Sequence, residues 1–127
     1  MSKKNSLLLV EDDQLLGPLY LHLLGDAGYV VTHCRTASET EEMVLKKKFD
    51  LVLLDVMLPD LSGLELLSRF YRLVPVPVVL LTNLDQPQVK EKALQFGALG
   101  CLIKSEYTPD EFLDRIAYYL ASVSNFR

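Results

Sequence analysis

Short apolar runs alternate with amphipathic segments along the chain, and this alternation predicts a sheet built from five strands. The strand-like runs cover residues 6–10, 29–34, 51–54, 76–81 and 100–103. Most of them are continuously apolar, which is typical of parallel strands that are covered on both faces. The second run contains Thr32 and His33, and this greater polarity suits an edge strand.

Helix-period stripes occupy the segments between these runs. The first stripe has spacings of four residues and is carried by Leu15, Leu19 and Leu23, with Leu16, Tyr20 and Leu24 beside them. Helix-start signals stand at Thr36-x-x-Glu39, Ser62-x-x-Glu65, Asp85-x-x-Gln88 and Thr108-Pro109-x-Glu111. The first, second and fourth of these are capping boxes, and the third is a helix start with an acidic cap. For the first helix two starts stay open, because Gly17-Pro18 either begins it or interrupts a helix that starts near Asp13.

Five strands alternating with five helices predict an α/β fold. Right-handed βαβ units of this kind form a doubly wound parallel sheet. The length of 127 residues is that of one ordinary domain, and no repeat, linker or low-complexity tract interrupts the pattern. We expect residues 1–127 to form a single domain, without an effector domain in this chain.

Charge and hydropathy narrow the partners and the compartment. Seventeen acidic and thirteen basic side chains give a net charge of -4, which argues against nucleic acid as a direct partner. The one basic run, Lys46-Lys47-Lys48, is interpreted as a solvated helix end that opposes the helix dipole. The N-terminus does not resemble a signal peptide, and the longest apolar stretch, residues 73–81, contains Pro75 and Pro77 and cannot span a bilayer. We therefore expect a cytoplasmic protein without a membrane segment.

The two cysteines, Cys34 and Cys101, are far apart in the sequence and form no C-x-x-C pair. Each lies inside a strand-like run. Both are therefore expected to behave as small buried hydrophobic residues in a reducing compartment.

Chemically reactive side chains stand where the apolar runs end. The residues that follow the runs are Glu11-Asp12-Asp13, Asp55, Thr82-Asn83 and Lys104. Ligands of an open α/β sheet bind beyond the carboxyl ends of its strands, so we expect these side chains in one crevice. Neighbouring carboxylates repel one another unless a cation joins them. A Mg²⁺ ion fits this need, with Asp12 and Asp55 as direct ligands and Glu11 acting through a water.

Thr82 and Lys104 indicate a phosphoryl group beside the metal. The ammonium and the hydroxyl can both donate to phosphate oxygens, and Mg²⁺ neutralises charge during in-line transfer. Asp55 would then be a nucleophile that forms an aspartyl phosphate. Each residue alone has an ordinary structural explanation, such as a helix cap for Asp13. Only the joint arrangement at the ends of separate strands supports a reactive site.

With these residues the chain resembles a bacterial two-component response regulator receiver domain over nearly its whole length. The matching features are Glu11-Asp12, the segment Asp55-x-x-x-Pro59-x-x-x-Gly63, Thr82, and Gly97-Ala98 leading to Lys104. The resemblance implies a flavodoxin-like (βα)₅ fold with strand order 2-1-3-4-5. It also implies that a histidine kinase or phosphotransfer protein phosphorylates Asp55 with Mg²⁺, and that the domain catalyses only its own phosphorylation and dephosphorylation.

The same resemblance implies roles for individual residues. Asp12, Asp55 and the Met57 backbone carbonyl would hold the metal with Glu11 behind them, and Thr82 and Lys104 would bind the phosphoryl group. The output would be a change of surface on the fourth helix, fifth strand and fifth helix. That surface would be read by a downstream protein or a second copy of the chain.

Two positions, Cys101 and Ser105, depart from the family pattern, and Met57 and Leu84 stand where the family varies its dephosphorylation rate. Cys101 stands where the family usually has an aromatic residue, so we expect switching to rely on the Thr82–Asn83–Leu84 loop and the helix after it. Ser105 stands where the family usually has a cis proline, and a trans Lys104–Ser105 bond is predicted because a cis bond before a non-proline residue costs about 3–4 kcal/mol. Met57 and Leu84 cannot position water by hydrogen bonding, which predicts slow self-dephosphorylation.

Two other function classes are compatible with parts of the pattern. A pseudo-receiver would bind proteins without phosphorylation, but the intact set of acidic residues, threonine and lysine argues against it. A phosphohydrolase with an aspartate nucleophile often carries a second acid two residues later, where this chain has Met57. Such an enzyme also needs a cap over its substrate, and the chain is too short to supply one.

Overall fold

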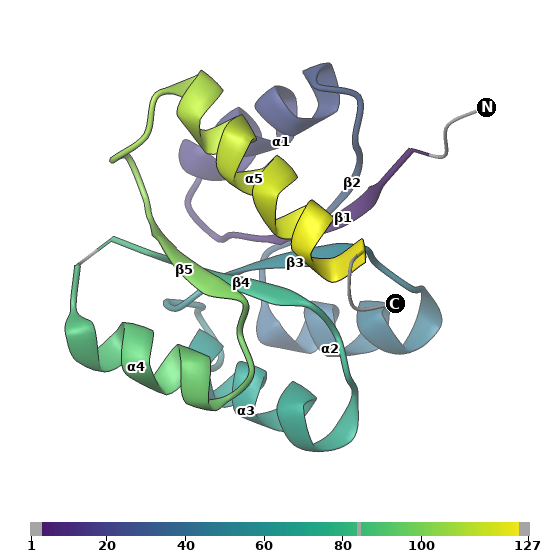
Figure 1. The fold of residues 1–127 in the computed structure, drawn as a ribbon. Helices are drawn as coiled ribbons and strands as arrows, with labels where there is room; N and C mark the ends of the chain where they lie inside the picture. The colour runs from purple at the N-terminus through teal and green to yellow at the C-terminus, as the bar shows by residue number, and fades with distance from the viewer. Residues whose placement is uncertain (1–3, 84, 125–127) are drawn as a thin grey trace.

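Five parallel strands form one sheet in the order β2-β1-β3-β4-β5, with helices on both faces (Figure 1). The computed structural model describes residues 4–83 and 85–124. The strands are β1 (Ser6–Val10), β2 (Val30–Cys34), β3 (Leu51–Asp55), β4 (Val78–Thr82) and β5 (Gly100–Ile103). The helices are α1 (Leu16–Asp26), α2 (Ala37–Lys46), α3 (Gly63–Leu73), α4 (Pro87–Gln95) and α5 (Pro109–Ser124). The α/β class, the doubly wound sheet and the strand order are confirmed.

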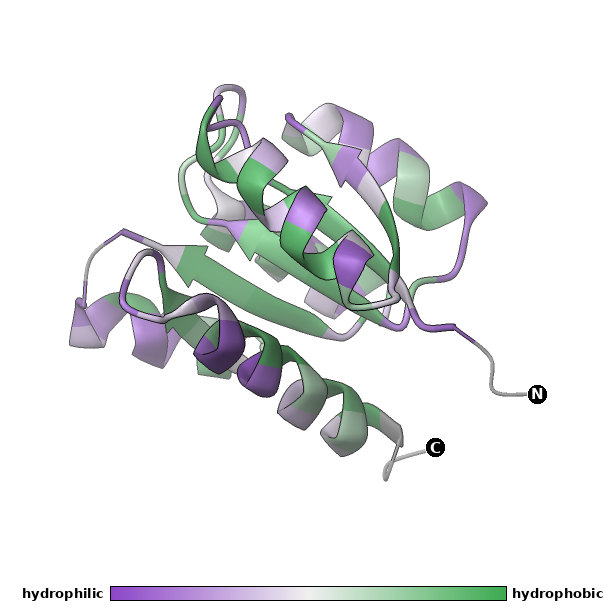
Figure 2. Ribbon diagram, turned by 90° about the horizontal axis from the view of Figure 1, so that it is seen from above, coloured by the Kyte–Doolittle hydropathy of each residue, from purple (hydrophilic) through white to green (hydrophobic). Residues whose placement is uncertain are grey.

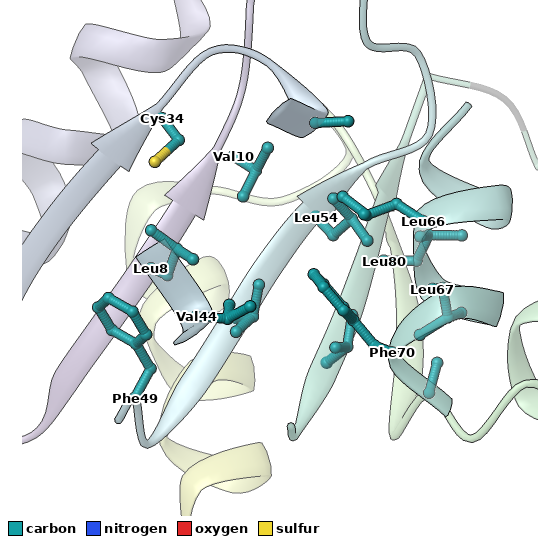
Figure 3. Packing of buried hydrophobic residues seen from close by; sticks show 14 of the residues in the cluster. Leu8, Val10, Cys34, Val44, Phe49, Leu54, Leu66, Leu67, Phe70 and Leu80 are labelled. Atoms are coloured by element: carbon teal, nitrogen blue, oxygen red, sulfur yellow. The ribbon is translucent and has the colours of Figure 1, made fainter. Parts of the chain in front are cut away.

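Successive residues of the strands point to opposite faces of the sheet and build two cores. On one face Leu8, Val10, Val52 and Leu54 pack against α2, α3 and α4 (Figure 3). On the other face Leu7, Leu9, Leu51 and Leu53 pack against α1 and α5. The continuous apolar runs exist because both faces are covered. Figure 2 shows the apolar strands between helices that turn polar stretches outward.

The strand ends differ slightly from the predicted ones, and the differences concern the site. β3 extends to Asp55 and β4 extends to Thr82. Pairing between the two strands continues to this point, because the Val56 amide donates to the Leu81 carbonyl at 2.9 Å. β4 starts at Val78, two residues after the predicted start. β2 lies at the edge of the sheet and is the most exposed strand, as its polarity predicted.

Two of the predicted capping boxes form as expected. Thr36 and Glu39 cap α2 reciprocally. Thr108 and Glu111 do the same at α5, with hydrogen bonds of 2.8 Å and 3.1 Å. At α3, Ser62 accepts from the Leu64 amide at 3.2 Å, one residue earlier than in a capping box. These caps satisfy amides that the first turn of a helix leaves without a backbone partner.

The predicted acidic cap of α4 is wrong, and the start of α1 is settled. α4 has Gln86 at its N-cap and Pro87 in its first turn, a position where the missing proline N–H costs no hydrogen bond. α1 begins at Leu16, so Gly17 and Pro18 lie in its first turn. Leu15 is its N-cap residue, and in the turn before the helix Asp13 Oδ1 accepts from the Leu15 and Leu16 amides at 2.8 Å each.

None of the helices in the described part of the chain is long and apolar enough to cross a membrane.

Candidate functional site

The sheet register places the four strand ends of the predicted site next to one another. Val10 of β1 pairs with Leu54 of β3, so Glu11 and Asp55 follow at neighbouring positions. Asp55 pairs with Leu81 of β4, which directly precedes Thr82. Thr82 pairs with Ile103, and the Lys104 amide donates to the Thr82 carbonyl at 2.7 Å. Parallel pairing therefore brings the predicted residues to one edge of the sheet.

Lys104 links the two carboxylates of the crevice. Its Nζ lies 2.6 Å from Glu11 Oε1 and 2.9 Å from Asp55 Oδ2. All three side chains are buried, with at most 7% of each residue exposed. A buried charge without a partner costs several kcal/mol in a protein interior, on the order of 3–5 when one member of a pair is removed. The three groups therefore depend on one another.

The environment of the cluster shifts the pKa values of Glu11 and Lys104. Burial raises the pKa of Glu11 to about 7, and a hydrogen bond with Asp55 adds to this, while Lys104 acts in the opposite direction. Burial lowers the pKa of Lys104, but hydrogen bonds to Glu11 and Asp55 outweigh it and the net shift is upward. Lys104 therefore stays charged, and Glu11 takes up a proton more readily than an exposed glutamate.

The loop after Asp55 closes tightly beneath it. Asp55 Oδ1 accepts from the Met57 amide at 3.1 Å, and the Gly63 amide donates to the Val56 carbonyl at 2.7 Å. A Cβ atom at Gly63 would collide with the Asp55 carbonyl oxygen, so only glycine fits there. Asp60 ties the same loop to α2 by accepting from the Ala37 amide at 2.9 Å. This contact joins segments 23 residues apart, and the sequence pattern did not reveal it.

The donor groups near Asp55 fit a hard divalent cation. Asp55, Asp12 and the Met57 carbonyl carry oxygen atoms of the kind that Mg²⁺ takes as ligands, and Asp12 is exposed directly after the buried Glu11. Within residues 4–83 and 85–124, no three acidic, histidine or cysteine side chains are grouped so that they could hold a metal together. Mg²⁺ usually takes one or two carboxylates and keeps several waters, so these donors suffice for it.

The segment after Lys104 adopts an uncommon backbone conformation. Ser105 has φ 66°, and the described residues contain no cis peptide bond, so the predicted trans Lys104–Ser105 bond is confirmed. Residues other than glycine are uncommon at such positive φ values. Tyr20 of α1 borders this segment, where burial raises the pKa of its hydroxyl and the Ser105 backbone acts to lower that pKa by less. Its ring stacks on Phe112 of α5, with centroids 4.8 Å apart.

Sequence reasoning treated Tyr20 only as part of an apolar helix stripe. Its hydroxyl is a polar atom on a residue that is 6% exposed, and a buried tyrosine hydroxyl usually finds a partner. That rule shows that a partner exists, but the sequence does not say which backbone group it is.

The two cysteines differ in how deeply they are buried. Cys34 is buried as predicted, whereas Cys101 is only half-buried, and both thiols are free. Burial raises the pKa of the Cys101 thiol, which packs against the core beside α3 and α4. The predictions that involve Leu84 lie outside the described residues.

The sequence of the chain matches a known protein family and several known proteins. Residues 7–117 match the family model of the response regulator receiver domain. The transcriptional regulatory protein DltR of Streptococcus agalactiae serotype III (strain NEM316) is 37% identical over 111 residues, which cover 87% of this chain and 49% of DltR. RstA of Escherichia coli (strain K12), also a transcriptional regulatory protein, is 34% identical over 116 residues, 91% of this chain and 48% of RstA. The chain thus spans about half the length of these curated relatives.

Solved structures give the same result for the fold. A CheY-like response regulator receiver domain protein from Methanospirillum hungatei JF-1 superposes with a TM-score of 0.90 and 26% identity, covering 98% of this chain and all of the other. The BeF3-activated N-terminal receiver domain of Klebsiella pneumoniae RstA superposes with a TM-score of 0.84 and 34% identity, covering 91% of this chain and 98% of the other.

Proposed function

This chain belongs to the response regulator receiver domain family, and on that premise we propose that it is a phosphoacceptor switch of a two-component system. Asp55 accepts a phosphoryl group from the phosphorylated histidine of a kinase or phosphotransfer protein. The resulting change of surface signals to a downstream partner. The two free thiols suit a reducing cytoplasm as the place of action.

The observation that carries this proposal is the contact between Lys104 Nζ and Asp55 Oδ2, at 2.9 Å. An ammonium held against the carboxylate that ends a central strand lies where a phosphoryl group on that carboxylate would place its negative oxygens. Thr82, the last residue of β4, supplies a hydroxyl at the same edge of the sheet. BeF3 activation of the Klebsiella pneumoniae RstA receiver domain supports a site of this kind in a relative.

In the proposed transfer, an Asp55 carboxylate oxygen forms a bond to phosphorus while the bond from phosphorus to the donor histidine nitrogen breaks. Lys104 and Thr82 bind the phosphoryl oxygens. Asp12, Asp55 and the Met57 carbonyl are the proposed ligands of Mg²⁺, with Glu11 acting through a water. Held by these residues, the ion would supply positive charge that offsets the negative charge of the transferred group.

Asp55 needs no general base, because a carboxylate is already deprotonated when it attacks. The domain acts on itself and is not an enzyme for a separate substrate. Phosphorylation adds about 1.5–2 negative charges to the crevice, and this charge alters the loops around it. The proposed readout face consists of α4, β5 and α5. A downstream protein or a second copy of the chain is its proposed partner.

Mass spectrometry of the intact protein tests this proposal. The protein is incubated with acetyl phosphate, with and without Mg²⁺, beside the variants Asp55→Asn and Asp114→Asn. Asp114 is an exposed acid on α5 and serves as the matched control. We expect one Mg²⁺-dependent adduct that is lost in Asp55→Asn and kept in Asp114→Asn. A folded wild-type protein that binds Mg²⁺ and gains no adduct would contradict the proposal and favour a binding module that works without phosphorylation.

A further inference from the structure

Three adjoining hollows lie at the starting ends of β3 and β4, opposite the Asp55 crevice. Their volumes are about 590 Å³, 310 Å³ and 280 Å³. The first and second share Lys48 and Pro75, and the first and third share Phe70. They therefore form one surface, called here the amino-edge groove. It is defined by Leu45, Lys48, Phe70, Tyr71, Leu73 and Pro75, and its lining comes from α2, α3, the end of α5 and the segments before β3 and β4.

Large apolar side chains are exposed around the amino-edge groove. Leu45 is 74% exposed, Leu73 77% and Tyr71 65%. Such side chains scattered singly are normal, but a group of them around a hollow marks an interaction site. Their exposure is not needed for packing, because α2 and α3 already bury Val44, Leu67 and Phe70 in the core.

One wall of the groove is preformed. The Tyr71 ring lies against Gly97, where an added Cβ atom would be 2.8 Å from the ring. Gly97 also has φ 84°, a conformation that favours glycine. The ring is therefore seated before any partner arrives, which lowers the entropy cost of binding.

The groove carries positive charge in an acidic protein. Lys46, Lys47 and Lys48 are exposed beside it, and Lys48 lines two of its hollows. At the other end, Glu41 pairs with Arg69 at 2.9 Å, so these two charges offset each other. The whole chain has a net charge of -4. The basic run is thus a local feature that complements an acidic ligand.

We infer that the amino-edge groove docks an amphipathic segment of a partner protein, with apolar side chains in the hollows and acidic side chains on the lysines. This combination of anchors is that of a peptide bound in an apolar groove. A membrane surface fits less well, because lipid-binding clusters typically carry about 4–8 basic residues and the net charge of the chain opposes anionic lipids. The groove and Asp55 lie at opposite ends of the strands, so docking and phosphorylation do not compete.

A displayed library of random peptides tests this inference without assuming a sequence. The library is selected against the wild-type protein and counter-selected against Leu45→Ser/Leu73→Ser. Affinities of enriched peptides are then measured for the wild type, for Lys46→Glu/Lys48→Glu and for a control. The control, Leu15→Ser/Leu19→Ser, changes two exposed leucines outside the groove and outside the readout face, 83% and 50% exposed. Circular dichroism and phosphorylation at Asp55 verify that each variant is folded.

We expect the enriched peptides to be acidic and amphipathic. Their affinity for either groove variant should be at least about tenfold lower than for the wild type, which is the size of effect expected when one buried leucine contact is lost. The control should bind as the wild type does. Peptides without acidic residues, or equal binding to the charge-reversed variant, would overturn the inference. Two other results would also overturn the inference. One is that the wild type sediments with phosphatidylglycerol vesicles and the groove variants do not. The other is that the wild type forms a concentration-dependent dimer and the groove variants do not. Because phosphorylation is measured separately, failure here leaves the proposed function untouched.

Discussion

The Lys104 ammonium lies 2.6 Å from Glu11 Oε1, and both side chains are buried at the end of the sheet. Glu11 therefore takes part in an ion pair in addition to its predicted role near the metal. Glu11 and Asp55 share the Lys104 cation, which offsets the repulsion between these two neighbouring buried carboxylates. Removing or neutralising any one of the three groups should change both the stability of the fold and the chemistry of Asp55.

Replacing the lysine tests this dependence. Lys104→Met should lower the free energy of unfolding by about 3 kcal/mol at pH 8, because Glu11 and Asp55 lose their buried cation. The loss should be smaller at pH 5, where Glu11 is protonated. Urea unfolding measures both values, and Lys90→Met, which removes an exposed lysine of α4, serves as the control. Equal losses in the two variants would contradict the burial argument.

The raised pKa of Glu11 predicts an unusual pH dependence. With a pKa of about 7 in the folded state against 4.5 ordinarily, the folded protein binds more protons than the unfolded chain between these values. Stability should therefore fall as the pH rises from about 4.5 to 7, by about 3 kcal/mol in total. Unfolding free energies at several pH values test this. The slope should flatten in Glu11→Gln and persist in Glu91→Gln, which alters an exposed glutamate.

The contact between Tyr20 and Ser105 predicts a positioning role for the tyrosine hydroxyl. Tyr20→Phe keeps the stack on Phe112 but removes the hydroxyl beside the Ser105 backbone, and should cost about 1 kcal/mol of stability. If the hydroxyl also steadies Lys104, phosphorylation by acetyl phosphate should slow several-fold, with the main change in the rate at saturating donor. Tyr107→Phe is the matched control. Unchanged rates would limit Tyr20 to a structural role.

The positive φ of Ser105 predicts a stabilising substitution. Ser105→Gly should raise the free energy of unfolding by about 1 kcal/mol, because glycine adopts φ 66° without steric cost. Ser122→Gly, inside α5, should have the opposite sign, since glycine weakens a helix by about 1 kcal/mol. Thermal and urea unfolding of both variants would decide. Destabilisation by Ser105→Gly would mean that the serine side chain holds this turn.

Met57 predicts a long phosphate lifetime. Its side chain is 73% exposed beside Asp55 and cannot orient water by hydrogen bonding. Met57→Asn should therefore speed loss of the phosphoryl group several-fold, measured as the decay of the intact-mass adduct. Leu45→Asn, at an equally exposed position far from Asp55, should leave the decay unchanged. Identical decay in all three proteins would refute this explanation.

Local patterns in the sequence account for the fold and for the identity of the residues that make up the site. The apolar runs that end in Glu11, Asp55, Thr82 and Lys104 place these residues at strand ends, because a doubly wound parallel sheet gathers its carboxyl ends at one edge. The caps at Thr36 and Thr108 are equally local and were also predicted. The α4 cap was assigned wrongly because Asp85 and Pro87 are competing signals in the same short segment.

Contacts between distant segments account for the rest, because they depend on how side chains meet after the helices pack. No spacing in the sequence indicates that Lys104 pairs with Glu11, or that Tyr20 reaches the Ser105 backbone 85 residues later. The amino-edge groove is of the same kind. Its lysines were predicted as the solvated end of α2, and their position beside exposed Leu45 and Leu73 arises only when α2 and α3 lie side by side on the sheet.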